Sequence, residues 1–474
     1  MQLRKLRIIF TALFFSFFFV FFFSLSLSRY YSYQIFYYDF GVFSRILWEL
    51  SRFQTPYIDH VVLGRIFFLG DHFNPSLTLV APFYWLVSNP QILLFEQALA
   101  LVLTGILIFL IAGKVKLGYI PSLVISLSYL IFAGTENPLV TDWHAEPTAV
   151  FFLALFFYLF SFTQKRVLYY LTAIIFLGFK ESNAITFIFV LTCLLVFNKE
   201  KRKDIFMLIA ASLAWLYVST NIFSFIFSKR PYLYYPELPT SPWEMITNFF
   251  STPEKRKLVF DSLISFGFLP FFSVFGVIAV FGELAIRLAP TKTIFQNFTL
   301  GSHYSVYLSL ILTLTTIYAI TNIKKIYPKK WLVSLIIFYL LIISLFSARK
   351  ITKSPINLAF NHVFWKELKT NGQNFNWVDK IPKKGTVMSL NNLLPYFSAR
   401  TEKLSFLNKY YKEVEPDIII FNMTPGQSAN NFWSMEEKDL GLIRDFLLQD
   451  KDYVRTKTDD KLLFIFIKKF FRSS

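Results

Sequence analysis

The stretch IIFTALFFSFFFVFFFSLSL (8–27) decides the class of fold to which this chain belongs. It is as long as the ~20 apolar residues that a helix needs to cross a bilayer. Arg4, Lys5 and Arg7 precede it, as basic residues do in a secretory signal. However, the run exceeds the ~7–15 residues of a signal's apolar core and lacks a small-residue cleavage site. We therefore expect an uncleaved transmembrane helix with a cytoplasmic N-terminus.

The composition of the whole chain extends this interpretation. Of 474 residues, 55% are hydrophobic and only 16% are charged, whereas soluble domains average about 25% charged residues. The net charge of +18 is typical of the cytoplasmic flanks of a membrane protein, so we expect no nucleic-acid partner. The single Cys193 cannot form an internal disulfide. These features exclude a soluble enzyme, a disordered chain and a disulfide scaffold.

Further apolar runs predict about eleven transmembrane helices in residues 1–348. If the runs alternate in direction, the main basic clusters all fall on one side of the membrane, which is the positive-inside pattern. We therefore expect a multi-pass protein of the plasma (inner) membrane, with residues 349–474 outside. The runs after the first lie at about 91–113, 119–133, 147–163, 168–179, 183–197, 205–227, 258–269, 271–288, 304–322 and 331–347.

Two places depart from simple crossings. Residues 168–197 hold two runs too short to span comfortably, with Lys180-Glu181 at their junction. This pattern indicates a half-height hairpin whose charged tip ends inside the protein, because bare charges are not tolerated against lipid. Leu269-Pro270 interrupts the run 258–288, which is either two spans or one broken helix.

The parts outside the membrane differ in character. In the outer loop 29–90, segments 40–53 and 76–88 carry apolar residues at helical spacing and predict interfacial helices. The tail 349–474 predicts a small extracytoplasmic α/β domain. Its expected strands are TVMSLN (386–391), PDIIIFNM (416–423) and KLLFIFIKK (461–469), and its expected helix is EEKDLGLIRDFLLQ (436–449).

Carboxylates and histidines gather on the predicted outer face. A carboxylate there could accept a proton from an attacking hydroxyl, and a carboxylate–histidine group could hold a divalent cation. Lys180, at the tip of the short hairpin, could stabilise charge on a leaving phosphate. The outer-face residues singled out are Asp39, Asp71, His72, Asp142, His144, Glu146 and His303.

Each of these residues also has a plainer explanation. Asp39 could cap a helix, since it precedes an apolar stretch. Asp71-His72 could simply end a loop before Asn74-Pro75, and residues 142–146 could form a solvated loop. Lys180-Glu181 could be an internal ion pair that stabilises the hairpin. The chain contains no G-x-x-x-x-G-K-[ST] loop, so ATP-driven transport by this chain alone is not expected.

Five motifs carry a resemblance to a known family of bacterial and archaeal multi-spanning proteins, described as predicted membrane proteins with a domain of unknown function. They are D-F-G-V-F-x-R-x-L-W-E-L (39–50), F-L-G-D-H-F-N-P (68–75), D-W-H-A-E-P (142–147), F-K-E-S (179–182) and H-Y-S-V-Y (303–307). That family resembles the GT-C glycosyltransferases, which use lipid-phosphate-linked sugars on the non-cytoplasmic side. The resemblance implies a GT-C-like helical fold.

The resemblance also implies roles for particular residues. Asp39 matches the first-loop carboxylate that is catalytic or binds metal in that superfamily, although the usual second acid is missing here. Lys180 and His303 would stabilise the leaving phosphate. Asp71, His72, Glu181 and Tyr304 would shape the substrate pocket, and Asp142, His144 and Glu146 are possible ligands of a divalent cation such as Mg or Mn.

The leading hypothesis is therefore a glycosyltransferase of the cell envelope. It would transfer a sugar from a polyprenyl-phosphate donor in the lipid bilayer to an extracytoplasmic glycan, lipid or protein acceptor. The alternative is a transporter or lipid-handling protein without covalent chemistry, in which Lys180-Glu181 would be a gate or proton site. A third hypothesis is an assembly protein that acts through residues 349–474.

Overall fold

The computed structural model describes residues 2–60, 64–291, 295–400, 403–432, 435–456, 458 and 460–471. It divides into two compact units. Unit 1 consists of Met1–Phe23, Tyr57–Leu79 and Phe95–Asn361. Unit 2 consists of Ser24–Pro56, Val80–Leu94 and His362–Ser474.

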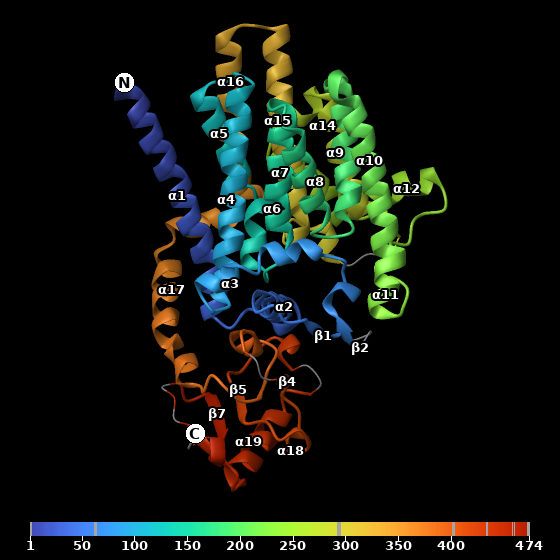
Figure 1. Cartoon of the computed structure of the whole chain (residues 1–474). Coiled ribbons are helices and arrows are strands. Elements are labelled where there is room, and N and C mark those ends of the chain that lie inside the picture. The colour runs from blue at the N-terminus through green and yellow to red at the C-terminus, as the bar shows by residue number, and fades with distance from the viewer. Residues whose placement is uncertain are drawn as a thin grey trace. The chain divides into compact units, whose positions relative to one another are not determined.

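Unit 1 is a bundle of apolar helices (Figure 1). A two-stranded antiparallel ribbon, β1 (Tyr57–His60) and β2 (Gly64–Phe67), accompanies them. The helices are α1 (Gln2–Tyr31) and α4 (Gln91–Lys114), which both continue into unit 2, with α5 (Tyr119–Leu130), α6 (Ala133–Glu136), α7 (Glu146–Phe162), α8 (Arg166–Leu177), α9 (Asn183–Phe197), α10 (Arg202–Tyr217), α11 (Ser224–Ser228), α12 (Pro242–Phe249), α13 (Pro253–Ile264), α14 (Val274–Leu288), α15 (Val306–Ile326) and α16 (Lys330–Phe346).

Within the described residues, five helical segments are long and apolar enough to cross a membrane. The bent pair Tyr119–Leu130 and Ala133–Val140, with an angle of 61°, raises the number to six if it is one span. Helices α7, α8 and the described part of α9 are apolar but shorter. The protein is thus helical with several apolar helices, while the expected total of about eleven crossings stays a prediction. The five segments are Gln2–Tyr31, Gln91–Lys114, Lys199–Ser228, His303–Ile326 and Lys330–Ile351.

Both predicted interruptions are present. Short helices α8 and α9 flank a turn at 178–182 that carries Lys180 and Glu181. However, α8 packs mainly on α7 and α9 mainly on α10, so the two helices do not form a tightly packed hairpin. A single 3-10 turn, Leu269–Phe272, separates α13 from α14. The run 258–288 is therefore two short helices with a break between them.

The basic clusters gather at one end of the bundle, where the turns α4–α5 and α15–α16 lie together (Figure 1). Lys324 Nζ donates to Lys116 O over 2.5 Å, which joins two of the clusters directly. Lys201 Nζ donates to Thr163 O over 2.9 Å at the end of α7. The clusters thus share one face, as the alternation of the runs predicted.

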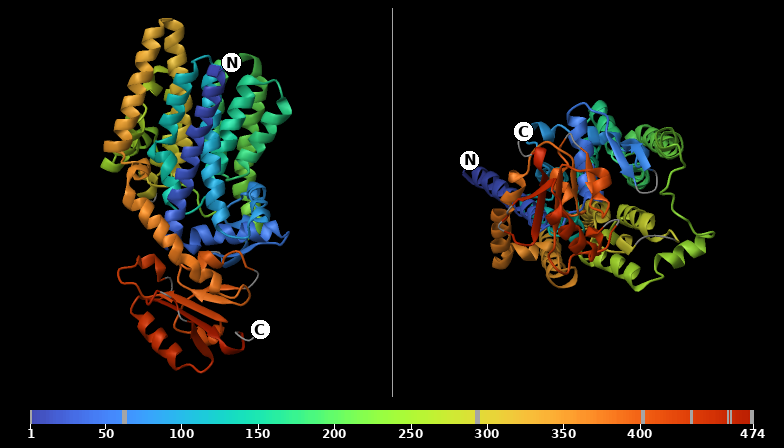
Figure 2. Two further views of the ribbon diagram at one scale, coloured as in Figure 1. Left: turned by 90° about the vertical axis from the view of Figure 1, so that its left-hand side faces the viewer. Right: turned by 90° about the horizontal axis from the view of Figure 1, so that it is seen from below.

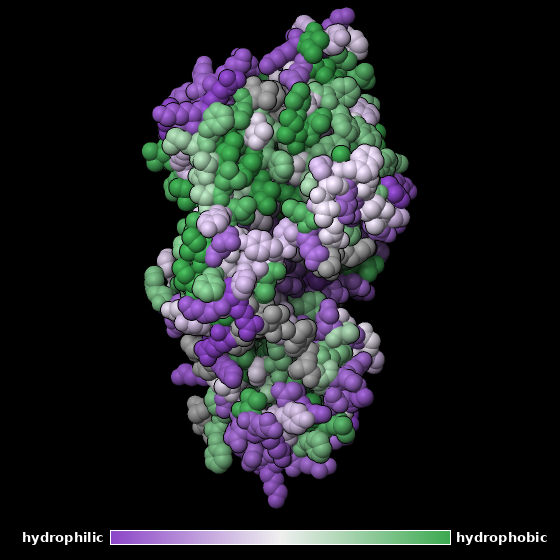
Figure 3. Space-filling view, turned by 90° about the vertical axis from the view of Figure 1, so that its right-hand side faces the viewer, coloured by the Kyte–Doolittle hydropathy of each residue, from purple (hydrophilic) through white to green (hydrophobic). Residues whose placement is uncertain are grey.

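The outer surface of unit 1 is apolar over much of its helices. Figure 3 shows hydrophobic side chains over the helices seen from the α10 side and hydrophilic side chains at their ends. Phe206, Met207 and Leu213 of α10 are more than half exposed. Such a surface is costly in water and suits contact with lipid.

Unit 2 contains a five-stranded sheet of order β4-β3-β5-β7-β6 (Figure 2). Strands β4, β3 and β5 are parallel, whereas β7 is antiparallel to both β5 and β6. Leu440, Ile443 and Leu447 form the buried face of α19 (Asp439–Gln449). The strands are β3 (Val387–Ser389), β4 (Leu404–Phe406), β5 (Ile418–Asn422), β6 (Tyr453–Thr456) and β7 (Leu463–Lys468), and the other helices are α2 (Val42–Ser51), α3 (Phe83–Leu86), α17 (His362–Asn374) and α18 (Tyr411–Val414).

The three predicted strands are present as β3, β5 and β7, because each is a continuous apolar run that is buried on both faces. Strands β4 and β6 were not predicted, since both are short and only partly buried. The predicted helix 40–53 corresponds to α2, preceded by a π-helical turn at Tyr37–Gly41. The predicted helix 76–88 is instead two short pieces, Pro75–Leu79 and Phe83–Leu86, with Pro82 between them.

Candidate functional site

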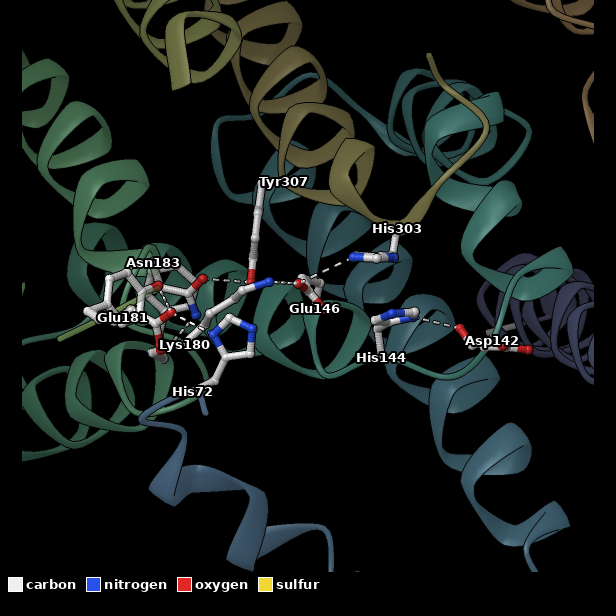
Figure 4. A network of polar contacts seen from close by, with 11 residues as sticks. His72, Asp142, His144, Glu146, Lys180, Glu181, Asn183, His303 and Tyr307 are labelled. Carbon is white, nitrogen blue, oxygen red and sulfur yellow. Dashed lines mark hydrogen bonds and ion pairs between the residues drawn. The ribbon is translucent and has the colours of Figure 1, made fainter. Parts of the chain in front are cut away.

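The candidate site is a cluster of ionisable side chains in unit 1, called here the polar network. Its members are His72, His144, Glu146, Lys180, Glu181 and His303, which Figure 4 labels, and Asp71, which Tyr234 links to His72. Most of its members lie in three places: at the start of α7, in the turn between α8 and α9, and in the short helical turn His303–Ser305 before α15. Helices α7, α8 and α15 each reach the basic end of the bundle with their other terminus. The polar network therefore lies at the end opposite to the basic clusters.

Glu146 and Lys180 form the centre of the polar network. Lys180 Nζ donates to Glu146 Oε1 over 2.8 Å. His303 Nε2 lies 3.7 Å from the same oxygen. The Lys180 side chain is 23% exposed, whereas that of Glu146 is 5% exposed. The carboxylate is thus buried while the ammonium keeps access to solvent or a ligand.

Two histidines extend this centre. The rings of His144 and His303 stack, with centroids 3.5 Å apart. His144 Nδ1 lies 2.8 Å from the backbone oxygen of Asp142, which orients the ring. The Tyr304 ring lies 4.0 Å from the His303 ring and 5.7 Å from Lys180 Nζ.

A second ion pair lies on the other side of the α8–α9 turn. His72 Nδ1 is 2.7 Å from Glu181 Oε1. Ser76 N donates to Gly178 O over 2.8 Å, and a Cβ added at Gly178 would lie 2.3 Å from Ser76 Oγ. A side chain at residue 178 would therefore collide with Ser76, where the segment that follows His72 contacts the α8–α9 turn. Adjacent Lys180 and Glu181 bond to different partners, so the suggested internal Lys180–Glu181 pair is not the one that forms.

Two tyrosines that were not predicted from the sequence donate hydrogen bonds to carboxylates of the polar network. Tyr232 donates its hydroxyl to Glu181 Oε1. Tyr234 donates to Asp71 Oδ1 over 2.5 Å and stacks on His72, with centroids 4.4 Å apart. Both tyrosines lie in the stretch KRPYLYYP (229–236), whose aromatic residues resemble those of any membrane-interface loop. No local pattern separates them from the other tyrosines.

The His72–Glu181 pair shifts the pKa of both groups. Burial lowers the pKa of His72, but the negative charges of Glu181 and Asp71 outweigh it, so the pKa is raised above 6.5. Burial raises the pKa of Glu181, but His72 and the hydrogen bonds from His72 and Tyr232 lower it to about 2. Each group thus favours the charged form of the other.

We expect this pair to stabilise the protein in a defined pH range. The raised pKa of His72 adds stability that is full below pH 6.5 and is lost as the pH rises through the folded-state value. The lowered pKa of Glu181 adds stability that is full above pH 4.5 and is lost as the pH falls towards about 2. His72→Gln should lower the thermal unfolding midpoint most between these two values. An equal decrease at pH 10 would contradict the ion pair.

Glu96 is a second residue that the sequence analysis left out, although a lone acid in a transmembrane run is a signal for function. It lies on α4, is 3% exposed and accepts hydrogen bonds from Trp143 Nε1 over 3.0 Å and from Thr148 Oγ1 over 2.5 Å. The two donor residues lie on either side of His144 and Glu146 in the sequence. Glu96 therefore holds two members of the polar network in place.

Replacement of Glu96 by alanine is expected to loosen this segment, because it leaves two buried donors without an acceptor at a cost of about 1–3 kcal/mol each. Backbone amides 142–148 should lose protection from hydrogen exchange. Glu283→Ala is the matched control, since Glu283 is also 3% exposed and accepts from Thr186 Oγ1 on another helix. Equal loss of protection in both variants would contradict a local role for Glu96.

A divalent cation at Asp142, His144 and Glu146 does not fit this geometry well. Within the described part of the chain, no three His, Cys, Asp or Glu side chains are arranged to hold a metal ion. The Glu146 carboxylate already pairs with the Lys180 ammonium, which would repel a cation. The cation stays a prediction, and no step below passes through it.

Asp39 belongs to unit 2, in the middle of the π-helical turn Tyr37–Gly41. The turn follows extended residue Phe36 and leads directly into α2. The N-cap position of α2 is occupied by Gly41, two residues after Asp39. The other predicted site residues all belong to unit 1.

Comparison with known proteins places this arrangement in context. Residues 29–463 match a family model described as "Predicted membrane protein (DUF2079)". Among solved structures, ArnT from Cupriavidus metallidurans bound to undecaprenyl phosphate is similar, with a TM-score of 0.50 and 10% identity over 96% of this chain and 97% of that chain. No match is found among curated proteins. The expected resemblance to this family is thereby confirmed, and the likeness to ArnT shows a similar fold.

Proposed function

This chain belongs to the DUF2079 family of predicted membrane proteins, and from that membership and its ArnT-like fold we propose that it is a membrane glycosyltransferase. Its donor would be a sugar linked to a polyprenyl phosphate, and its acceptor an extracytoplasmic glycan, lipid or protein. The ArnT structure contains undecaprenyl phosphate, which supports a lipid phosphate of this class. We place the protein in the inner membrane with the basic end of unit 1 in the cytoplasm and the polar network on the outer side.

The observation that carries the proposal is the environment of Lys180. An ammonium has three donors, and among the described residues Glu146 accepts from one of them, so a phosphate oxygen could accept from another. Lys180 has a partly exposed side chain, and His303 lies beside the same carboxylate. A fixed cation at a low-dielectric site stabilises the negative charge that develops on a leaving phosphate.

Asp39 would act as the general base. The acceptor hydroxyl attacks the anomeric carbon of the donor, a new C–O bond forms, and the hydroxyl proton passes to the Asp39 carboxylate. The bond from the anomeric carbon to the phosphate oxygen breaks, and its electron pair leaves with the lipid phosphate. Attack from the face opposite to the leaving group inverts the anomeric configuration.

The second half of the polar network suits recognition of the sugar. Glu181 and Asp71 accept hydrogen bonds from the hydroxyls of Tyr232 and Tyr234, so their carboxylates lie where they can bond hydroxyl groups. The stacked rings of His72 and Tyr234 add a flat apolar surface. Hydroxyl-rich ligands are bound by such combinations of carboxylates and aromatic faces.

The direct test uses purified protein with polyprenyl-phosphate sugars carrying a labelled sugar. We expect transfer of the label to an added glycan, lipid or protein fraction, with release of an equal amount of lipid phosphate. A heat-inactivated sample controls for spontaneous hydrolysis. Absence of release from every donor tried would reject the proposal.

A transporter or lipid-handling protein is the second candidate. The 3-10 break between α13 and α14 favours it, because discontinuous helices line many transport sites. Movement of a lipid-linked sugar across proteoliposomes without loss of the phosphate–sugar bond would support this candidate over the first.

A further inference from the structure

The turn that carries Asp39 is an unusual piece of backbone. Residues Tyr37–Gly41 form a single π-helical turn, a conformation that is rare and often found at functional sites. A Cβ added at Gly41 would lie 2.3 Å from Cδ2 of Tyr37, so the tyrosine ring occupies the space of a side chain there. A larger residue at position 41 would therefore collide with the Tyr37 ring as it lies here.

Asn391 bonds to this turn from a point 354 residues away in the sequence. Tyr37 N donates to Asn391 Oδ1 over 2.9 Å and to Asn391 O over 2.9 Å. Tyr38 N donates to the same Oδ1 over 3.4 Å. Asn391 is 3% exposed, and its Nδ2 donates to Asn430 O over 2.9 Å. Its carboxamide is therefore held on both sides.

The position of Asn391 in the sheet of unit 2 explains why it reaches the turn. Strands β3 and β4 are parallel, so their carboxyl ends lie at one edge of the sheet. Asn391 follows β3 by two residues, and Phe406 ends β4. The Phe406 ring stacks on Tyr38 at 4.9 Å and meets Tyr37 edge-on at 5.7 Å. In open α/β sheets, ligands commonly bind beside the carboxyl ends of parallel strands. In this sheet, the Tyr37–Gly41 turn lies at that edge.

We propose that Asn391 is a positioning residue that sets the orientation of the Asp39 carboxylate through the backbone of Tyr37 and Tyr38. The proposal rests on the proposed function, in which Asp39 is the general base. It assigns the tail a part in holding the proposed general base, which belongs to the same unit. A displacement of about 1 Å in a reacting group can cost about 10²-fold in rate, so small errors in this turn matter.

The test compares Asn391→Ala with Asn371→Ala. Asn371 Nδ2 donates to Ser32 Oγ over 3.1 Å, which is also a bond from the tail to the first loop, but it does not touch the turn. In Asn391→Ala we expect the amide of Tyr38, which donates to the Asn391 side chain, to lose protection from hydrogen exchange. The amide of Tyr37 should lose less, because the backbone oxygen of residue 391 still accepts from it, and the amides of β5 should keep their protection. The kcat should decrease about 10–10²-fold with the donor KM unchanged. Asn371→Ala should show neither effect.

A double variant identifies the route of the effect. Asp39→Asn with Asn391→Ala should be no slower than Asp39→Asn alone, because residues that act as one unit are not additive. Unchanged amide protection, equal losses in the two asparagine variants, or lost protection with full turnover would each overturn the proposal. If Asp39→Asn keeps full activity, the proposed base is rejected, while the exchange data still decide whether Asn391 holds the turn.

Discussion

Replacement of Lys180 by methionine is expected to lower kcat by about 10²–10³-fold, the usual cost of removing one group that stabilises developing negative charge. Methionine is unbranched, fills the space of the lysine stem up to Cε and lacks the ammonium. Release of lipid phosphate from the labelled donor measures the effect. Lys201→Met is the matched control, since Lys201 is likewise a partly buried lysine of unit 1, but it donates to backbone carbonyls at the basic end of the bundle.

The same substitution also affects stability, and this must be separated from catalysis. Loss of Lys180 leaves the Glu146 carboxylate buried without its cation, which costs about 3–5 kcal/mol for a fully buried pair. In the double variant Lys180→Met with Glu146→Gln, the unpaired charge is gone and the thermal unfolding midpoint should recover. Turnover should stay low. Recovery of turnover together with stability would show that Lys180 serves the fold alone.

Replacement of Asp39 by asparagine is expected to lower kcat by about 10²–10⁴-fold, because the carboxamide has nearly the same shape but cannot accept the acceptor's proton. The donor KM and the thermal unfolding midpoint should change little. Asp379→Asn is the matched control, since Asp379 is an exposed acid of the same unit. Retained turnover in Asp39→Asn would remove this residue from the chemistry.

The local elements of this protein follow from its sequence to a large extent. Apolar runs such as 331–347 appear as helices, because a peptide surrounded by lipid must satisfy its hydrogen bonds internally. The strands β5 and β7 appear as predicted, since both are continuous apolar runs. The failure at 76–88 has a local cause, because Pro82 cannot continue a helix from the residue before it.

The residues of the candidate site could be predicted from their types in the sequence, but the partner of each side chain could not. His303 and Lys180 were expected near each other, and the structure places both at one oxygen of Glu146. Tyr232 and Tyr234 were missed because 25 tyrosines occur in the chain and nothing local marks these two. Glu96 is the opposite case, because an acid within an apolar run is a pattern from which its role could have been predicted.

What the sequence by itself determined is the class of the protein: a membrane-embedded helical chain with basic residues at one end of its bundle and acids and histidines at the other. These properties depend on local hydropathy and charge, which each segment carries regardless of its neighbours. Only the tertiary structure decided that Lys180 pairs with Glu146 and its neighbour Glu181 with His72, and that Asn391 holds the turn of Asp39. Such pairs join segments far apart in the chain, and the packing of whole helices and strands, which no local pattern records, brings them within bonding distance.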